Sequence, residues 1–247
     1  MREPILNAYF NDLPEDALRG VLDWPVRPCL GQRDRQQALP KTGGKARRRA
    51  AVHVFCQKVQ EKYSEGTLCR LLTVESPSTR TAAAFALGLL GSQRCNSHLA
   101  RCLQDADETV AETAIDALWS LWFRGENSQH SDELYRILRI RDRGKSLIAL
   151  EDLIHRAPGY AEAFNQRAMI YFRMELYELA AADCETTLNL NPYHYGAQTG
   201  LGQCYLRLRR HRAALRAFRL ALRINPRLDG IADTVKALEN TLGEEGR

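Results

Sequence analysis

Few residues in this sequence have a spacing that catalysis would require. His53 and Cys56 lie three positions apart, which on a helix would place a thiol beside a base. A core cysteine next to a surface histidine produces the same pattern. Gly43, Gly44 and Lys45 are only part of a phosphate-binding loop, because the upstream glycine and the Ser or Thr after the lysine are missing. We therefore expect no catalytic residue at either place.

The cysteines and histidines are dispersed along the chain. No CxxC pair occurs, and the odd number of cysteines argues against a secreted disulfide framework. Because metal sites need clustered ligands, we expect no metal, no cofactor and no enzymatic activity. The residues concerned are Cys29, Cys56, Cys69, Cys95, Cys102, Cys184 and Cys204, with His53, His98, His130, His155, His194 and His211.

Arginine gives the sharpest local chemistry. No acidic residue occurs between Glu185 and Asp229, although the whole chain carries a net charge of only +5. Four arginines in this window are spaced by 4, 3 and 4 residues, so on a helix they form one stripe opposite an apolar face. These residues, called the arginine stripe below, are Arg212, Arg216, Arg219 and Arg223.

Three interpretations of the stripe remain open. It is a solvated face neutralised by acids further along the chain, such as Asp229, Asp233 and Glu239, or it binds an acidic protein partner. The third interpretation is phosphate, in nucleic acid or at a membrane surface. Nucleic-acid binding would favour interleaved aromatic side chains, which the stripe lacks.

Composition predicts an all-α fold. The chain is 45% hydrophobic and 26% charged, and Leu, Ala and Arg are abundant while strand-forming residues are not. No apolar run approaches the roughly 20 residues that span a bilayer, and no N-terminal apolar run has signal-peptide length. We therefore expect a soluble cytoplasmic protein without membrane insertion.

Two copies of a 34-residue unit occupy 161–194 and 195–228. Pro158, Pro192 and Pro226 are 34 residues apart, and an asparagine precedes each of the last two prolines. Apolar residues in step with the prolines define two helices in each copy, and proline ends the second helix. A degenerate third copy is predicted at 127–160, and a closing helix at 229–242 should cover the last copy.

These motifs resemble tetratricopeptide repeats. The residues that match the family pattern are L-G-x-x-Y at 201–205, A-x-x-x-F-x-x-A at 214–221 and Pro226. The copy at 161–194 departs from the family pattern at Arg167, where a leucine is usual, and at Cys184, where an aromatic residue is usual. The resemblance implies an α-solenoid of antiparallel helix pairs over 126–247.

The N-terminal half has a repeat of its own. Ala82, Ala83, Ala86 and Leu87 recur 31 residues later as Thr113, Ala114, Ala117 and Leu118. The segments STRTAAAFALGLLG and TVAETAIDALWSLW resemble short HEAT-type repeats, and Arg80 ahead of the alanine-rich helix fits that family. We assign 45–125 to this module. Residues 1–44 are an N-terminal segment with a short helix predicted at 14–22, a linker from 32 and a basic patch that includes Lys41 and Arg47 to Arg49.

The tetratricopeptide resemblance implies a non-catalytic scaffold or adaptor that binds a protein or peptide, with an acidic partner as one option. In that family the first helix of each repeat lines a concave surface. Carried over by position, this predicted inner face comprises Tyr135, Arg139, Asn165, Met169, Arg173, Thr199, Gln203 and Arg207. The family's chaperone-peptide clamp is not expected, because Gly196 and Gly200 stand where it needs cations.

Arg139, Arg173 and Arg207 form a ladder at 34-residue spacing within the predicted inner face. The ladder would donate hydrogen bonds to acidic side chains or to a peptide carboxylate. A cation at the end of a first helix also suits the helix dipole without any partner. Two other functions stay open: nucleic-acid or polyanion binding through the arginine stripe, and a lyase-like accessory role suggested by some short HEAT-type repeats. The sequence leaves the oligomeric state undetermined.

Overall fold

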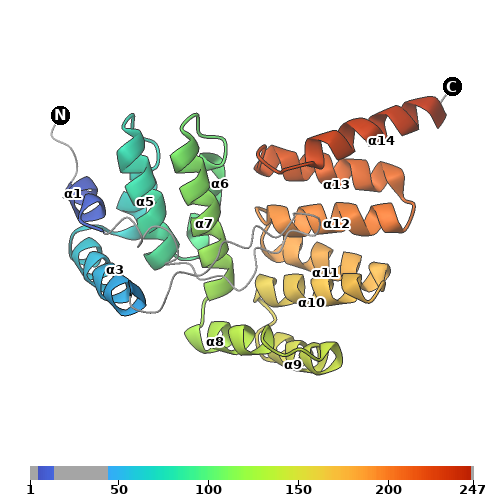
Figure 1. Cartoon of the computed structure of the whole chain (residues 1–247), viewed down its shortest axis with the longest axis horizontal. Coiled ribbons are helices and arrows are strands. Elements are labelled where there is room, and N and C mark those ends of the chain that lie inside the picture. Colours follow the sequence, from blue (N-terminus) through green and yellow to red (C-terminus); the bar gives the residue numbers. More distant parts are fainter. Residues whose placement is uncertain (1–4, 14–43, 246–247) are drawn as a thin grey trace. The chain divides into compact units, whose positions relative to one another are not determined.

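The computed structural model describes residues 5–13 and 44–245, with side chains described except at 44–49 and 244–245. Within these ranges every regular element is a helix (Figure 1), which confirms the predicted all-α fold. None of the described helices is both long and apolar enough to cross a bilayer. The helix predicted at 14–22, the linker from 32 and the basic patch at 41–49 lie outside the described side chains.

The chain divides into two compact units between Leu121 and Trp122. The repeat pattern predicts this boundary between 125 and 126, just after the helix that ends at Arg124. In the first unit the elements are α1 (Ile5–Asn11), α3 (Gly44–Lys62), α4 (Glu65–Leu71), α5 (Pro77–Leu90), the 3-10 helix η1 (Gln93–Cys95), α6 (Asn96–Cys102) and most of α7 (Glu108–Arg124).

The alanine-rich helix α5 is the core of the first unit. Ser76 caps its first turn by accepting a hydrogen bond from the backbone of Thr79, and Pro77 follows at the first helical position. Helices α1, α3 and α4 all contact α5. A Cβ added at Gly88 would lie 2.9 Å from the Cα of Ala117, so glycine is needed for α5 and α7 to approach this closely.

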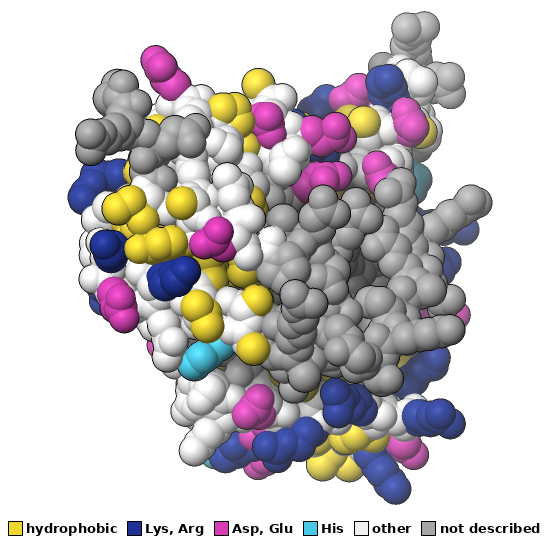
Figure 2. All heavy atoms as spheres, turned by 60° about the vertical axis from the view of Figure 1, so that its left-hand side comes forward, with side chains coloured by type: hydrophobic (Ala, Val, Ile, Leu, Met, Phe, Trp, Pro, Cys, Tyr) yellow, Lys and Arg dark blue, Asp and Glu magenta, His cyan; other side chains and the backbone are white. Residues whose placement is uncertain are grey.

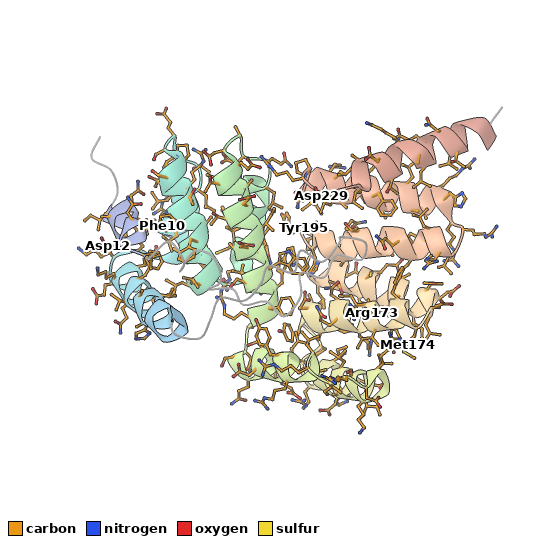
Figure 3. All side chains as sticks on the ribbon, in the orientation of Figure 1. Phe10, Asp12, Arg173, Met174, Tyr195 and Asp229 are labelled. Atoms are coloured by element: carbon orange, nitrogen blue, oxygen red, sulfur yellow. The ribbon has the colours of Figure 1, made fainter. Side chains whose placement is uncertain are left out.

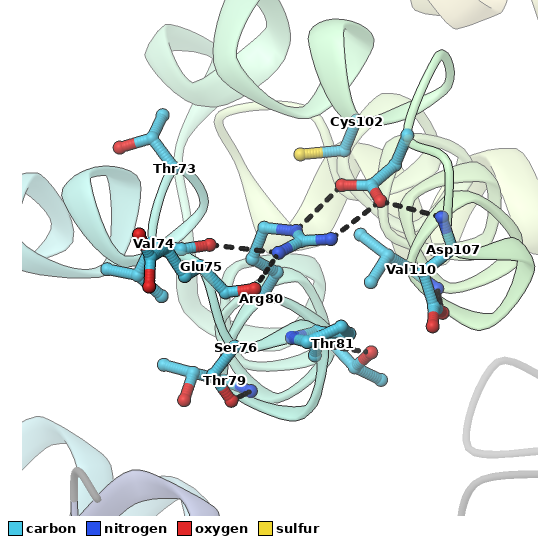
Figure 4. Close-up of polar contacts among 12 residues, drawn as sticks. Thr73, Val74, Glu75, Ser76, Thr79, Arg80, Thr81, Cys102, Asp107 and Val110 are labelled. Atoms are coloured by element: carbon cyan, nitrogen blue, oxygen red, sulfur yellow. Dashed lines mark hydrogen bonds and ion pairs between the residues drawn. The ribbon is translucent and has the colours of Figure 1, made fainter.

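Arg80 connects the loop that follows α4 to the loop that follows α6 (Figure 4). Its Nε and Nη2 donate to the two carboxylate oxygens of Asp105 at 2.7 and 2.8 Å. Its Nη1 donates to the backbone carbonyls of Val74 and Glu75 at 2.9 and 2.7 Å. One guanidinium therefore closes the turn before α5 and holds it to the turn after α6. Arg80 lies in the first turn of the alanine-rich helix and not ahead of it, because α5 begins at Pro77.

The second unit is a stack of helix pairs, as expected for an α-solenoid. Each of α10, α11, α12 and α13 packs on the next helix in the chain, and α13 packs on α14 (Figure 1). The pair α8–α9 occupies the region of the predicted degenerate copy. The helices are α8 (Ser128–Ile137), α9 (Arg143–Arg156), α10 (Ala161–Arg173), α11 (Tyr177–Leu190), α12 (Tyr195–Arg207), α13 (His211–Ile224) and α14 (Ile231–Glu245).

Equivalent residues end the helices of the two complete copies in the same way. Asn191 and Asn225 are the C-caps of α11 and α13, and their side-chain oxygens accept from the backbone of Tyr193 and Arg227. The prolines that follow exclude another helical turn. The repeated asparagine and proline therefore set the length of both second helices.

Small residues let the paired helices of the second copy approach closely. A Cβ added at Gly202 would meet the ring of Phe218 at 2.6 Å, so only glycine fits opposite that ring. Phe218 is 1% exposed and fills the space between α12 and α13. On the other side of α13, Ile231, Val235 and Leu238 of α14 are buried, while the opposite face of α14 is exposed. Helix α14 thus closes the stack with a polar outer surface.

Candidate functional site

The structure places the predicted inner face on α8, α10 and α12, except Arg139, which follows the C-cap of α8, and it contradicts the exposure of three of the residues. Asn165, Met169 and Thr199 are 3%, 6% and 1% exposed. Asn165 donates its amide to Glu162, and the Thr199 hydroxyl donates to the backbone carbonyl of Tyr195 in its own helix. The expectation that these three side chains are accessible to a partner is wrong, because the fold itself uses or covers them.

A buried polar cluster explains why this part of the inner face is closed. Glu162 and His194 are both 0% exposed, and His194 Nε2 lies 2.9 Å from Glu162 Oε2. Asn165 and Gln166 donate to the other carboxylate oxygen of Glu162 at 3.1 and 2.5 Å. The cluster joins the first turn of α10 to the residue that caps α12. Its donors and acceptors are paired with one another, so the cluster has a structural role in joining the two helices.

The last residues of α7 cover the same end of the second unit. The Trp122 ring stacks on His194 with centroids 4.1 Å apart and meets the Tyr195 ring edge-on. The Phe123 ring stacks on Tyr135, and the Tyr160 hydroxyl donates to the Phe123 carbonyl. A packing role for Trp122 is what an aromatic residue at the end of a repeat module predicts, but nothing in its spacing indicates that it lies on the start of α12.

The arginine ladder remains accessible at the other ends of the same helices. Arg139, Arg173 and Arg207 are exposed, and Figure 3 shows Arg173 and Met174 at the end of α10 far from Tyr195. Arg173 and Arg207 are the last residues of α10 and α12. Tyr135 and Gln203 are half-buried. The structure therefore divides the predicted inner face into a closed end and an open, cationic end.

Two aromatic rings contact one arginine of this ladder, Arg207. The guanidinium of Arg207 lies 5.9 Å from the ring centre of Phe172 and 5.5 Å from that of Tyr177. The two rings themselves meet edge-on at 5.3 Å. Both rings are half-buried, so they present part of their surface beside the arginines. We call Arg139, Arg173 and Arg207, with Phe172 and Tyr177, the ladder surface.

Two atypical residues of the first complete copy have a structural explanation. Arg167, which stands where leucine is usual, donates two hydrogen bonds of 2.8 Å to the carboxylate of Asp183. This contact joins α10 to α11, and the hydrogen bond from Arg167 to Asp183 raises the pKa of the arginine. Cys184, which stands where an aromatic is usual, is buried in the apolar cluster between α10, α11 and α12. Sequence reasoning identified both departures but did not find the ion pair.

The arginine stripe lies on the exposed side of α13. All four of its members are exposed, whereas Leu215 and Phe218 on the opposite side are buried, as the helical spacing predicts. Of the acids expected to neutralise the stripe, Glu239 accepts from Arg219 Nη2 at 2.7 Å. The described residues form no ion pair with Arg212 or Arg216. Leu220, beside the stripe, is 43% exposed.

Basic residues also gather at the first helix pair of the second unit. Figure 2 shows Lys and Arg side chains along the lower edge of the view, where Figure 1 draws α8 and α9. The exposed cations of this helix pair and its turn are Arg136, Arg139, Arg141, Arg143, Lys145 and Arg156. Acidic side chains occur among them in the same view, so this edge has mixed charge, unlike the acid-free stripe of α13.

The described residues give little support to catalysis. Among them no group of three or more His, Cys, Asp or Glu side chains is placed to hold a metal ion. A pocket in the first unit does bring Cys69, His98, Cys102 and Asp105 together, but its volume is only about 90 Å³. Small-molecule sites typically measure roughly 300–1,000 Å³. Burial raises the pKa of Cys69 and Cys102, which makes both poor nucleophiles.

Comparison with known proteins assigns both repeat types. A family model described as HEAT repeats matches residues 30–119, and a model described as tetratricopeptide repeat matches 161–194 and 195–228. A TPR repeat-containing protein of Rhizobium etli is 34% identical over 77 residues, which cover 31% of this chain and 38% of that protein. The chain therefore spans less than half the length of this curated relative.

Two solved structures are also similar. The first TPR of Spaghetti bound to an HSP90 peptide is 16% identical with a TM-score of 0.43, over 47% of this chain and 91% of that one. A thermophilic TPR protein of Thermus thermophilus is 16% identical with a TM-score of 0.35, over 78% of this chain and 92% of that one. The tetratricopeptide match coincides with the two repeats that the spacing of Pro158, Pro192 and Pro226 predicts. The chain therefore contains tetratricopeptide repeats at 161–194 and 195–228 and HEAT repeats within 30–119.

Proposed function

We propose that this protein is a non-catalytic scaffold that binds a peptide or protein segment of a partner on the ladder surface of its second unit. The observation that carries the proposal is the exposure of Arg139, Arg173 and Arg207 while the other end of the inner face is closed. A partner that lies along the first helices must therefore contact their C-terminal ends. Tetratricopeptide repeats at 161–228 support protein binding as the class of function.

The chemistry of the ladder surface suits a carboxylate-bearing partner. A guanidinium over an aromatic ring is held in place by cation–π attraction while its N–H groups can still donate in a planar fork. Arg207 has this arrangement over Phe172 and Tyr177. Charge-assisted pairs between arginine and carboxylate are about twice as strong as neutral hydrogen bonds. The partially exposed rings add apolar contact area beside the charges.

Affinity capture tests the proposal. The tagged full-length protein would be used to capture partners from a native lysate at physiological salt, and a reproducibly enriched protein would be purified and titrated. The variant with Arg173→Gln and Arg207→Gln should bind it about tenfold more weakly, since an exposed ion pair is worth about 0.2–1 kcal/mol and a total of about 1.4 kcal/mol is tenfold in affinity. The matched control removes two exposed arginines of the first unit, Arg70→Gln and Arg101→Gln, and should bind as the wild type does.

Two results would count against this proposal. Failure to enrich any protein reproducibly would remove the support for a scaffold. Equal binding by the ladder variant and the wild type would show that the partner uses a different surface.

A further inference from the structure

The arginine stripe is an exposed cationic line along α13. Arg212 and Arg216 form no ion pair with described residues, and no acidic residue lies between Glu185 and Asp229. Arg212 with Arg216, and Arg219 with Arg223, are like charges four residues apart, which destabilise a helix. Arg212 also lies in the first turn of α13, where the helix dipole disfavours a cation. These costs oppose folding, and an external anion would offset them at Arg212 and Arg216.

The surroundings of the stripe favour a protein over a nucleic acid. Leu220 is 43% exposed and, by helical spacing, neighbours both Arg216 and Arg223. An apolar side chain within a cationic line matches an amphipathic helix that carries both carboxylates and apolar residues. Nucleic-acid bases would need exposed aromatic side chains for stacking, but the aromatic residue of α13, Phe218, is 1% exposed.

We propose that the outer face of α13 docks an acidic amphipathic helix of a partner protein. The docking surface consists of Arg212, Arg216, Arg219 and Arg223 with Leu220. The first and last arginines are eleven residues apart, so the stripe runs for about 16 Å at 1.5 Å per residue. Carboxylates at the same 4, 3, 4 spacing on a facing helix meet it along its length. This inference goes beyond the proposed function, because the ladder surface is made of other residues on other helices.

Arg219 is where the partner meets an existing contact. Its guanidinium donates to Glu239 of α14 through both Nε and Nη2, at 3.2 and 2.7 Å. Both side chains are exposed, with 56% and 41% of their side-chain surface accessible, so the pair is screened by water. A docked carboxylate shares or replaces Glu239 at this arginine. The other end of the stripe, Arg212 and Arg216, has no such competitor and is the better place to test.

The test uses synthetic peptides and the full-length protein. The probe is a labelled helical peptide about 18 residues long, enough for measurable helicity, with glutamates at the 4, 3, 4 spacing and leucines beside them. A scrambled peptide of the same composition keeps the charge but loses the stripe, and a single-stranded RNA of equal length represents nucleic acid. Fluorescence anisotropy would measure each affinity between about 50 and 200 mM salt.

We expect the striped peptide to bind about tenfold more tightly than the scrambled one, with affinity falling as salt rises. Arg212→Gln with Arg216→Gln should lose about tenfold, and the control Arg70→Gln with Arg101→Gln should not change. Glutamine has a helix propensity close to that of arginine and removes a repulsion, so the double variant should keep the thermal midpoint of the wild type. Leu220→Ala, which changes an exposed side chain without altering charge, should weaken the striped peptide severalfold and leave RNA unaffected.

Three outcomes would overturn the inference. They are no measurable binding of the striped peptide, equal binding of the scrambled peptide, and RNA binding that exceeds peptide binding and is lost in the same double variant. The last outcome would assign the stripe to polyanions instead. The ladder variant Arg173→Gln with Arg207→Gln should bind the striped peptide normally, so failure of one surface can be told from failure of the other.

Discussion

His194 Nε2 lies 2.9 Å from Glu162 Oε2, and both side chains are completely buried. The backbone N–H of Ala197 donates to His194 Nδ1 at 3.0 Å, so Nδ1 accepts and Nε2 carries the proton that it donates to Glu162. This fixes one tautomer of the histidine. The contact spans 32 positions in the sequence and links the start of α10 to the start of α12. It therefore acts as a staple between the two complete repeats.

Breaking this staple should cost much of the stability of the second unit. His194→Phe keeps an aromatic ring against Trp122 but leaves the buried Glu162 carboxylate without its histidine donor. Removing one partner of a buried hydrogen bond costs about 1–3 kcal/mol. We expect a loss of that size in the free energy of unfolding, measured by urea denaturation followed by circular dichroism.

The double variant with Glu162→Met and His194→Phe separates coupling from simple loss of packing. Once the carboxylate is gone, nothing buried requires the histidine donor, so the double variant should lose less stability than the two single changes added together. Strict additivity of the two losses would show that the pair is not coupled.

The Arg80 contact makes a similar prediction for the first unit. Arg80→Lys keeps the charge, but a lysine ammonium cannot donate two parallel bonds to Asp105 and also reach the carbonyls of Val74 and Glu75. At least one of these half-buried or exposed acceptors then loses its partner, at about 0.5–1.5 kcal/mol. A thermal midpoint several degrees below that of the wild type is expected by scanning calorimetry. Arg70→Lys, at an exposed arginine, should leave the midpoint unchanged.

The repeats were predictable from the sequence because their determinants recur at fixed spacing. The pairs Asn191–Pro192 and Asn225–Pro226 end helices in the same way in both copies, and Gly202 is required by the ring of Phe218. Each such residue acts on its own helix or on the adjacent one. Local geometry therefore determines which residue type each position requires, and the fixed spacing of these residues makes the repeats visible in the sequence.

The closure of the inner face was not predictable in this way. It depends on Trp122 and Phe123, which lie outside the repeats: Trp122 contacts His194 across a long stretch of sequence, and Phe123 contacts Tyr135 in the next helix. Position within the repeat predicts an exposed place for Asn165 and Thr199, but Asn165 donates to the buried carboxylate of Glu162, Thr199 donates to the carbonyl of Tyr195, and both are buried. Neither contact has a repeat of its own, so no periodic signal marked it. The ladder arginines are exposed as predicted, because Arg173 and Arg207 are the last residues of their helices and Arg139 follows the end of α8.

Two turns of the second unit carry backbone strain that glycine would relieve. Glu175 and Arg209, at equivalent positions after α10 and α12, have φ angles of 62° and 56°. Their turns are closed by bonds from the backbone N–H of Leu176 to the Tyr171 carbonyl and from that of Arg210 to the Tyr205 carbonyl. A non-glycine residue in this left-handed conformation costs about 1–2 kcal/mol.

Glu175→Gly and Arg209→Gly should therefore stabilise the second unit. Part of the relieved strain is offset by the greater freedom of glycine in the unfolded chain, so we expect a gain of about 0.5–1 kcal/mol for each change. Urea denaturation would measure it. Glu178→Gly, inside the first turns of α11, is the matched control and should destabilise by a similar amount, about 1 kcal/mol. If Glu175→Gly and Arg209→Gly both lowered the free energy of unfolding, the two left-handed residues would not be strained.

Buried thiols should make the first unit sensitive to alkali. Burial raises the pKa of Cys102 from 9.0 to about 11, with the nearby Asp105 carboxylate adding to the shift. In the unfolded chain this thiol ionises above pH 9, whereas in the folded protein it stays neutral until about pH 11. The stabilisation is therefore complete below pH 9 and is lost as the pH rises toward 11, by about 2–3 kcal/mol for a shift of this size.

The variant Cys102→Ala tests this alkaline loss directly. Urea denaturation at about pH 8 and pH 10.5 should show the wild type losing more stability than the variant, because alanine has no proton to lose. Cys69 and Cys95, whose pKa values burial also raises, remain in both proteins, so the difference between the two slopes isolates Cys102. Equal slopes would mean that the Cys102 thiol ionises as readily in the folded protein as in the unfolded chain.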